Sequence, residues 1–186
     1  KMAFVGCGLV TTVLPIFITS PVVLYLEFSS VSMQNIALID FFGFGVYGYA
    51  LNQAVLEDTQ FSNCSGNCSG AVFQGIFGPA TLTVQGCLFT NLSDQYSPFV
   101  ASALNVWSFN SVTVRDCMFY NLSSLIGAAY VFHSEVNVVN NTFVSLHGGA
   151  LRAYYSIVNI INSTFSRIVA EEGGAVNAAY SYLLSI

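Results

Sequence analysis

Hydrophobic and polar residues alternate in short runs along most of the chain, and these runs recur as a repeat. The clearest copy spans Ser111–Ser123, in which Val112 and Val114 alternate with polar residues. An Asp or Asn follows the alternating run, a Phe comes three residues later, and an Asn commonly comes two residues after the Phe. Alternation with a period of two indicates β-strands, and no stretch of the sequence shows helical periodicity with caps.

The repeat units can be aligned on their phenylalanines, which we call the anchors. The six anchors are Leu38, which replaces Phe, and Phe61, Phe89, Phe119, Phe143 and Phe165. They are separated by 23, 28, 30, 24 and 22 residues. A unit of this length is too small to bury its own apolar face, so successive units are expected to stack as in a solenoid. Equivalent residues would then lie about 4.8 Å apart.

A second column of the repeat lies three residues before each anchor. It contains Asn35, Asp58, Gly86, Asp116, Asn140 and Asn162. Asn and Asp tolerate tight turns and cap them with their side chains. We therefore predict a core ladder in which the side chains of Asn35, Asp58, Asp116, Asn140 and Asn162 are hydrogen-bonded beside the stacked rings of Phe61, Phe89, Phe119, Phe143 and Phe165.

A Gly-Ala element follows each of the five phenylalanine anchors at a variable distance. Its copies are Ser69–Val72, Ala101–Leu104, Ile126–Ala129, Gly148–Leu151 and Gly173–Val176. Combined with the alternating runs, these elements resemble a right-handed parallel β-helix. More narrowly, Gly148–Leu151 and Gly173–Val176 are similar to the Gly-Gly-Ala-(Ile/Leu/Val) repeats of polymorphic outer-membrane proteins. The Phe motif departs from that family, because it is mostly Phe-x-Asn rather than Phe-x-x-Asn.

This resemblance covers about residues 22–180 and implies an all-β, right-handed parallel β-helix of about six to seven coils. A mixed antiparallel β-sandwich is the alternative fold, but its strands would not bring the repeat columns together. We predict that residues 1–186 form a single β-helix segment, expected to be part of a longer chain because the last residues read as an unfinished strand.

Residues 1–26 are expected to form an opening coil of the β-helix. Residues 2–26 carry no charge and are numerous enough to span a bilayer, so a membrane or signal segment is the alternative. Gly6, Gly8, Pro15 and Pro21 count against a spanning helix, and the abundance of Val, Ile and Thr favours strands.

The composition is unusually poor in charge. Hydrophobic residues make up 54% of the chain and charged residues only 7%, against about 25% in an average soluble domain. The net charge of −5 and the four Lys and Arg residues leave no basic face for nucleic acid. So little charge gives poor solubility, so glycans, neighbouring subunits or a membrane are expected to cover the chain.

Six Asn-x-Ser/Thr sequons are present, at Asn63, Asn67, Asn91, Asn121, Asn140 and Asn162. We predict N-linked glycans at Asn63, Asn67, Asn91 and Asn121, in polar turns that would face water. Asn140 and Asn162 belong to the predicted core ladder and would be unmodified if that column points inward. Glycosylation would place the protein outside the cell or at its surface.

Five cysteines are present. Cys64 and Cys68 are close enough in sequence to form a disulfide within one loop. Cys87 and Cys117 each lie two residues before an anchor, so stacking would bring their Cα atoms within disulfide range; a buried column of free thiols is the alternative. Cys7 is left over. The cysteine and histidine spacings match no zinc site, and no cofactor is indicated.

Resemblance to β-helical polysaccharide lyases raises the question of an active site. Those enzymes gather acidic residues, which usually bind calcium, beside a basic residue that removes a proton. Asp58 and Asp116 share a column here but would lie two coils and about 10 Å apart. Neither they nor the candidate bases Arg115, Arg152 and Arg167 assemble into a recognisable catalytic set.

Aromatic residues follow the Gly-Ala elements at similar offsets. They are Trp107, Tyr154, Tyr155, Tyr180 and Tyr182. On an outer face they would either stack on sugar rings or pack against a neighbouring chain.

The sequence as a whole favours a non-enzymatic structural β-helix of a secreted or cell-surface glycoprotein, packing with other subunits into a filament, appendage or adhesin stalk. The alternative is a carbohydrate-binding or polysaccharide-cleaving β-helix.

Overall fold

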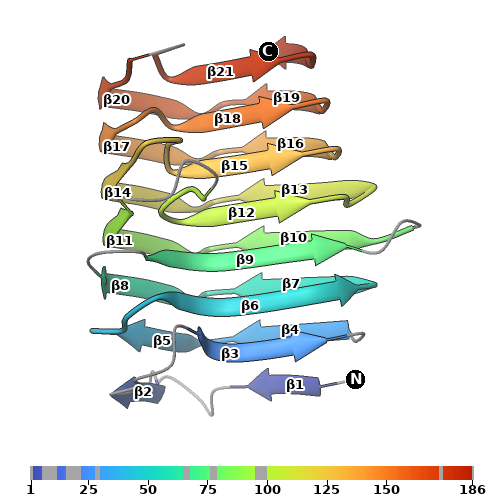
Figure 1. Ribbon diagram of the computed structural model, residues 1–186, viewed down its shortest axis with the longest axis vertical. Helices are drawn as coiled ribbons and strands as arrows, with labels where there is room; N and C mark the ends of the chain where they lie inside the picture. The colour runs from blue at the N-terminus through green and yellow to red at the C-terminus, as the bar shows by residue number, and fades with distance from the viewer. Residues whose placement is uncertain are drawn as a thin grey trace.

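The computed structural model describes residues 2–5, 12–15, 22–27, 30–64, 68–75, 79–94, 100–171 and 174–185. These residues form an all-β parallel solenoid of about six turns, with three parallel sheets and no helix within the described ranges. Figure 1 shows the turns stacked along the long axis, with the two chain ends at opposite ends of the stack. The prediction of a parallel β-helix is therefore confirmed.

Each turn contributes one strand to each sheet, in the order A, B, C. Sheet A contains β1 (Met2–Val5), β4 (Ser30–Gln34), β7 (Gln53–Glu57), β10 (Thr81–Gln85), β13 (Ser111–Arg115), β16 (Glu135–Val139), β19 (Ile157–Ile161) and β22 (Tyr182–Ser185). Sheet B contains β2 (Thr12–Pro15), β5 (Ile36–Ile39), β8 (Gln60–Cys64), β11 (Leu88–Asp94), β14 (Met118–Ser124), β17 (Thr142–His147) and β20 (Thr164–Val169). Sheet C contains β3 (Val22–Glu27), β6 (Phe44–Leu51), β9 (Ser69–Gly75), β12 (Leu104–Trp107), β15 (Ala129–Phe132), β18 (Leu151–Tyr154) and β21 (Val176–Ala179).

The anchor phenylalanines form a continuous stack inside the solenoid. In-register pairing of the sheet B strands sets each Phe directly beside the Phe of the next turn. Ring centroids from Phe61 through Phe89, Phe119 and Phe143 to Phe165 lie 5.1, 5.0, 4.5 and 5.0 Å apart, and neighbouring rings are within 8° of parallel. The first four of these rings are buried.

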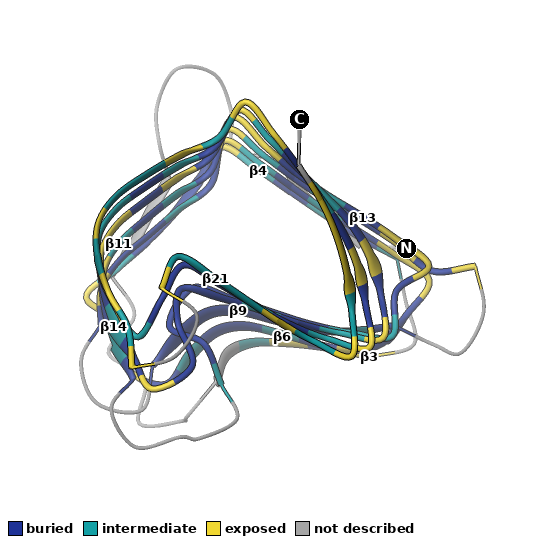
Figure 2. Cartoon of the chain, turned by 90° about the horizontal axis from the view of Figure 1, so that it is seen from above, coloured by how far each residue is buried: buried dark blue, intermediate teal, exposed yellow. Residues whose placement is uncertain are grey.

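The other two sheets complete the core with smaller side chains. Sheet A turns alternate residues inward, such as Val112 and Val114, and sheet C contributes Val106 and Val131. Viewed along the axis, the three sheets form the sides of the cross-section, and buried residues occur along each of them (Figure 2). One buried polar side-chain atom in the described ranges lacks a hydrogen-bond partner, the Ser102 hydroxyl oxygen.

Residues with positive φ turn the chain at the same places in every coil. Between sheets A and B they are Asn35, Asp58, Gly86, Asp116, Asn140 and Asn162, with φ from 46° to 61°. After the anchors they are Asp40, Asn63, Asn91, Asn121, Ser145 and Arg167. Left-handed backbone strains most L-residues, and Asn, Asp and Gly are the residues that adopt it most readily. The Asn and Asp of the repeat are therefore explained by backbone conformation.

The Gly-Gly-Ala element marks a close approach between successive turns. Gly148 has a φ of 101° and Gly149 a φ of 104°. A Cβ at Gly148 would overlap the carbonyl oxygen of Ser124 in the preceding turn. Glycine is required at this corner because both the backbone conformation and the available space exclude a side chain.

From the sequence, the opening segment could be either a coil of the β-helix or a membrane segment. In the structure it contains strands β1, β2 and β3. They pair in parallel with β4, β5 and β6 of the next turn. The rest of residues 1–21 lies outside the described ranges. Within the described part of the chain, no helix has both the length and the apolar character needed to cross a membrane.

Replacing one ring of the Phe stack should destabilise the fold strongly. We expect Phe119→Ala to lower the free energy of unfolding by about 3–5 kcal/mol, because it removes a buried ring that contacts the rings of both neighbouring turns. Urea denaturation followed by circular dichroism measures the change. Tyr120→Ala, on the exposed side of the same strand, is the matched control and should change stability much less; an equal loss in the two variants would contradict the stack.

Candidate functional site

The sequon asparagines after the anchors form a ladder on the surface. The Asn91 side-chain amide donates to Oδ1 of Asn63 at 3.0 Å, and the Asn121 amide donates to Oδ1 of Asn91 at 2.7 Å. All three side chains are exposed. Sequons on three successive turns therefore present their amides along one line. The fourth predicted site, Asn67, lies outside the described residues.

The column three residues before the anchors is also exposed, so the prediction that its Asn and Asp side chains lie in the core is wrong. Asn35, Asp58, Asp116, Asn140 and Asn162 all point to solvent. Asn140 donates to Asp116 at 3.3 Å and Asn162 donates to Asn140 at 2.9 Å, so a ladder exists on the outside of the corner. The physical reason is the left-handed backbone at this position, which directs the side chain outward and the next one inward. The sequons at Asn140 and Asn162 are consequently accessible.

A second column, one residue further along the chain, faces inward, and only its two cysteines were recognised from the sequence. Its members are Thr59, Cys87, Cys117, Asn141 and Ser163. Asn141 is buried, accepts the Cys117 backbone N–H at 2.9 Å and donates to the Val114 carbonyl at 2.8 Å. The shared feature that could have revealed the column is a small polar or thiol residue two positions before every Phe anchor. These side chains satisfy backbone groups at the corner, where the strand ladder is interrupted.

Two of the predicted disulfide cysteines are bonded and two are free. Cys64 and Cys68 form a disulfide with their Cα atoms 5.9 Å apart. Cys87 and Cys117 are buried free thiols, so the predicted bridge between them is absent. Their sulfurs instead donate to carbonyl oxygens, including Gln85 for Cys87 at 3.3 Å and Arg115 for Cys117 at 3.1 Å. The alternative prediction, a buried column of free thiols, is therefore confirmed for Cys87 and Cys117. Cys7 lies outside the described residues.

Exposed aromatic rings line the corner where sheet C leads into sheet A. The His133 and Tyr155 rings stack with centroids 5.2 Å apart, and Tyr155 and Tyr180 stack at 5.1 Å. The Tyr155 ring is therefore stacked between those of His133 and Tyr180, so both of its faces are in contact with protein. On the adjoining sheet C surface, the Arg152 guanidinium lies 5.5 Å from the Tyr154 ring centroid. This arrangement suits packing against another surface better than stacking on a sugar.

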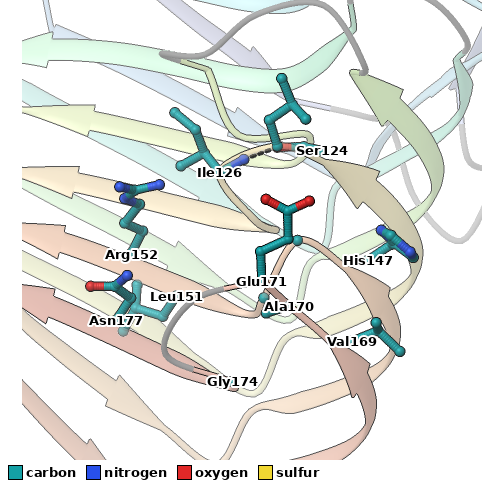
Figure 3. A pocket seen from close by; sticks show the side chains of 13 residues that line it. Ser124, Ile126, His147, Leu151, Arg152, Val169, Ala170, Glu171, Gly174 and Asn177 are labelled. Carbon is teal, nitrogen blue, oxygen red and sulfur yellow. Dashed lines mark hydrogen bonds between the residues drawn. The ribbon is translucent and has the colours of Figure 1, made fainter.

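A polar hollow with a volume of about 340 Å³ lies at the corner between sheets B and C. Ser124, His147, Arg152, Glu171 and Asn177 supply its polar side chains. Figure 3 shows the Glu171 side chain projecting toward the Ser124–Ile126 loop, where Ser124 Oγ accepts the Ile126 backbone N–H at 3.0 Å. Glu171 is the one carboxylate among the described lining residues, whereas glycoside hydrolysis ordinarily uses a pair. The hollow can hydrogen-bond a polar ligand.

The residues considered for catalysis lie on different sides of the solenoid. Arg115 is on sheet A and hydrogen-bonds Gln85, Arg152 is on sheet C, and Arg167 is in sheet B. Asp58 and Asp116 are separated by the turn that contains Gly86. Within the described ranges, no group of three or more His, Cys, Asp or Glu residues could hold a metal ion.

Fold and repeat columns together define a parallel β-solenoid built from stacked turns of about two dozen residues. No protein-family model, curated protein or solved structure matches this chain.

Removing the side-chain amide of Asn141 should lower the free energy of unfolding far more than removing that of its exposed neighbour, Asn140. Asn141→Ala leaves the Cys117 N–H and the Val114 carbonyl without partners, and we expect a loss of about 2–4 kcal/mol in unfolding free energy. Asn140→Gly keeps the positive φ and should change stability by about 0.5 kcal/mol or less. Urea denaturation of unglycosylated protein measures both. Equal losses would contradict the inward and outward assignment.

The buried thiols should resist alkylation in the folded protein. The pKa of Cys117 is raised by its hydrogen bond to Cys87 and by burial, so its thiol stays protonated at pH values where exposed thiols react. The same hydrogen bond lowers the pKa of Cys87, so the resistance of Cys87 depends on burial of its sulfur and not on protonation. We expect no iodoacetamide adduct on Cys87 or Cys117 at pH 8 in native buffer, and full labelling in urea, measured by peptide mass spectrometry. Cys64 and Cys68 should label only after reduction. Rapid native labelling of Cys117 would show that the column is accessible.

Proposed function

We propose that this chain is a non-enzymatic structural segment of a secreted or cell-surface glycoprotein, serving as a stiff rod in a filament, appendage or adhesin stalk. The observation that carries the proposal is the position of the five described sequon asparagines. Asn63, Asn91, Asn121, Asn140 and Asn162 are all exposed and all occupy the two outward columns. None of these five asparagines is buried, so each sequon is accessible from solvent.

The two columns are chemically suited to carry glycans. A carboxamide nitrogen has two hydrogens. The ladder bond from Asn91 to Asn63, or from Asn162 to Asn140, uses one of them. Attachment of a sugar replaces the other, so glycosylation and the ladder are compatible. Glycans on these columns would provide the hydration that a chain with 7% charged residues lacks.

A different side of the rod is suited to packing. Tyr155, Tyr180 and Tyr182 are 51%, 78% and 76% exposed, and Ile157 is exposed beside them. These residues lie at the corner between sheets C and A, whereas the sequon columns lie on sheet B and at the corner between sheets A and B. Exposed apolar surface of this kind usually marks an interface, which supports subunit packing that leaves the glycan columns free.

The closer assignment to repeats of the polymorphic outer-membrane type belongs to the same proposal. It is supported by the Gly148-Gly149-Ala150 corner, where the structure gives each glycine a positive φ. It would place the rod on a cell surface.

Glycopeptide mass spectrometry of natively isolated protein tests the proposal directly. Enzymatic deglycosylation in heavy-oxygen water marks each occupied Asn with a mass shift. We expect occupancy at Asn63, Asn91 and Asn121 and allow it at Asn140 and Asn162, because all five are exposed. Absence of glycan from every one of the five would overturn the glycoprotein assignment.

A second measurement asks whether the glycans keep the rod in solution. An endoglycosidase that leaves the first sugar attached shortens the glycans without creating new carboxylates. Light scattering should then show aggregation at a lower protein concentration than for the intact glycoprotein, because less of the apolar surface is covered. An unchanged concentration threshold would remove this role of the glycans.

A further inference from the structure

A second hollow lies on the outer face of sheet C, between the first turns of the solenoid. It has a volume of about 340 Å³ and is lined by four aromatic residues, Tyr25 on β3 and Phe44, Tyr47 and Tyr49 on β6. Because these four rings surround a depression on the surface, they are not part of the buried core.

The register of the two strands explains how the rings converge. Tyr25 pairs with Tyr47, and their rings stack with centroids 5.6 Å apart and planes within 6°. The ring centroids of Phe44 and Tyr47 lie 6.0 Å apart, and the planes of the two rings are inclined by 54°. Tyr49 lies two residues beyond Tyr47, on the same face of the strand. Tyr25 and Tyr49 are 55% and 37% exposed, so the rings are accessible from solvent.

A carboxylate stands beside this aromatic hollow. Glu27 pairs with Tyr49 across the two strands and is two residues from Tyr25, so it is on the same outer face. The pKa of Tyr25 is raised by partial loss of water around its phenol and then by the negative charge of Glu27. The three arginines of the chain lie on β13, β18 and β20, so none of them comes from the two strands that form the hollow.

Further along the same sheet the chain supplies its own cation to an aromatic ring. The Arg152 guanidinium lies 5.5 Å from the centre of the Tyr154 ring. The first turns present four rings and a carboxylate but no cationic residue on β3 or β6. Ring faces attract cations through their negative quadrupole, and clustered aromatic rings are a known means of binding quaternary ammonium groups.

We propose that the hollow formed by Tyr25, Phe44, Tyr47 and Tyr49 binds a quaternary ammonium group of the choline type, with Glu27 as its counter-charge. A methylated ammonium suits this site better than a primary one. Its methyl groups contact ring carbons, while a lysine-type ammonium is a strongly hydrated point charge that would lose water on entering an apolar hollow. The site is independent of the structural role proposed above.

The first experiment compares choline with its neutral isostere 3,3-dimethylbutan-1-ol at constant ionic strength. Saturation-transfer NMR titrations on the glycosylated full chain measure both dissociation constants. We expect choline to bind about tenfold more tightly, because only choline carries the charge that the rings and Glu27 attract. Equal affinities would mean that the hollow is merely apolar, and no saturable choline binding would overturn the site.

Variants identify the residues responsible. Tyr47→Leu should abolish measurable choline binding, and Glu27→Gln should weaken it about fivefold through loss of one nearby charge. Tyr120→Leu, which changes an exposed tyrosine on sheet B, is the matched control and should bind choline normally. Circular dichroism checks the fold of each variant. If Tyr47→Leu does not fold, Glu27→Gln still decides, and unchanged binding in that variant would refute the assigned counter-charge.

Vesicles distinguish the source of the ammonium group. Sedimentation with phosphatidylcholine vesicles, but not with phosphatidylglycerol vesicles, would assign the site to a lipid headgroup when Tyr47→Leu also abolishes it. Choline binding in solution without sedimentation would assign it to a free or otherwise linked choline. Sedimentation that persists in Tyr47→Leu would show that membrane contact does not use the hollow.

Discussion

In-register stacking of successive turns is the constraint on which the rest of this structure depends. A single turn contributes one Phe, a few branched aliphatic residues and three short strands, which cannot form a core alone. Pairing with the turns on either side satisfies the strand backbones and covers both faces of the Phe89, Phe119 and Phe143 rings. The spacing of the rings, from 4.5 to 5.1 Å, follows from the distance between paired strands. Every corner and every surface column inherits that repeat.

The sequence predicted the fold because the signals that define it are periodic. The anchors could be aligned despite units of unequal length, and the register then placed them in one column. The ladder residues were recognised but assigned to the wrong side, since Asn140 is exposed and Asn141 is buried. Alternation counted on from the buried Val138 would place Asn140 on the inner face, but the left-handed turn at Asn140 interrupts the alternation and directs its side chain outward. The small residues at 59, 87, 117, 141 and 163, each two positions before a Phe anchor, are the sequence feature that indicates the inward column.

The aromatic hollow could not have been predicted by the same reasoning. Tyr25 and Tyr47 are 22 residues apart and belong to turns whose repeat motif is weak. Their meeting depends on the pairing of β3 with β6, which sets Tyr25 beside Tyr47. The disulfide between Cys64 and Cys68 was easier to foresee, because their separation along the chain already limits their distance. Contacts within one loop can be read locally, whereas contacts between turns need the register first.

The positions of the chain ends have a mechanical consequence. They lie at opposite ends of the stack (Figure 1), so tension applied through them runs along the axis and falls first on the outermost turns. Because each turn is held only by its neighbours, such tension would peel the rod one turn at a time. The anchors are spaced 22 to 30 residues apart, so each released turn would add about 75 to 100 Å of extended chain. The rod would thus lengthen in steps under load while its remaining turns stay folded.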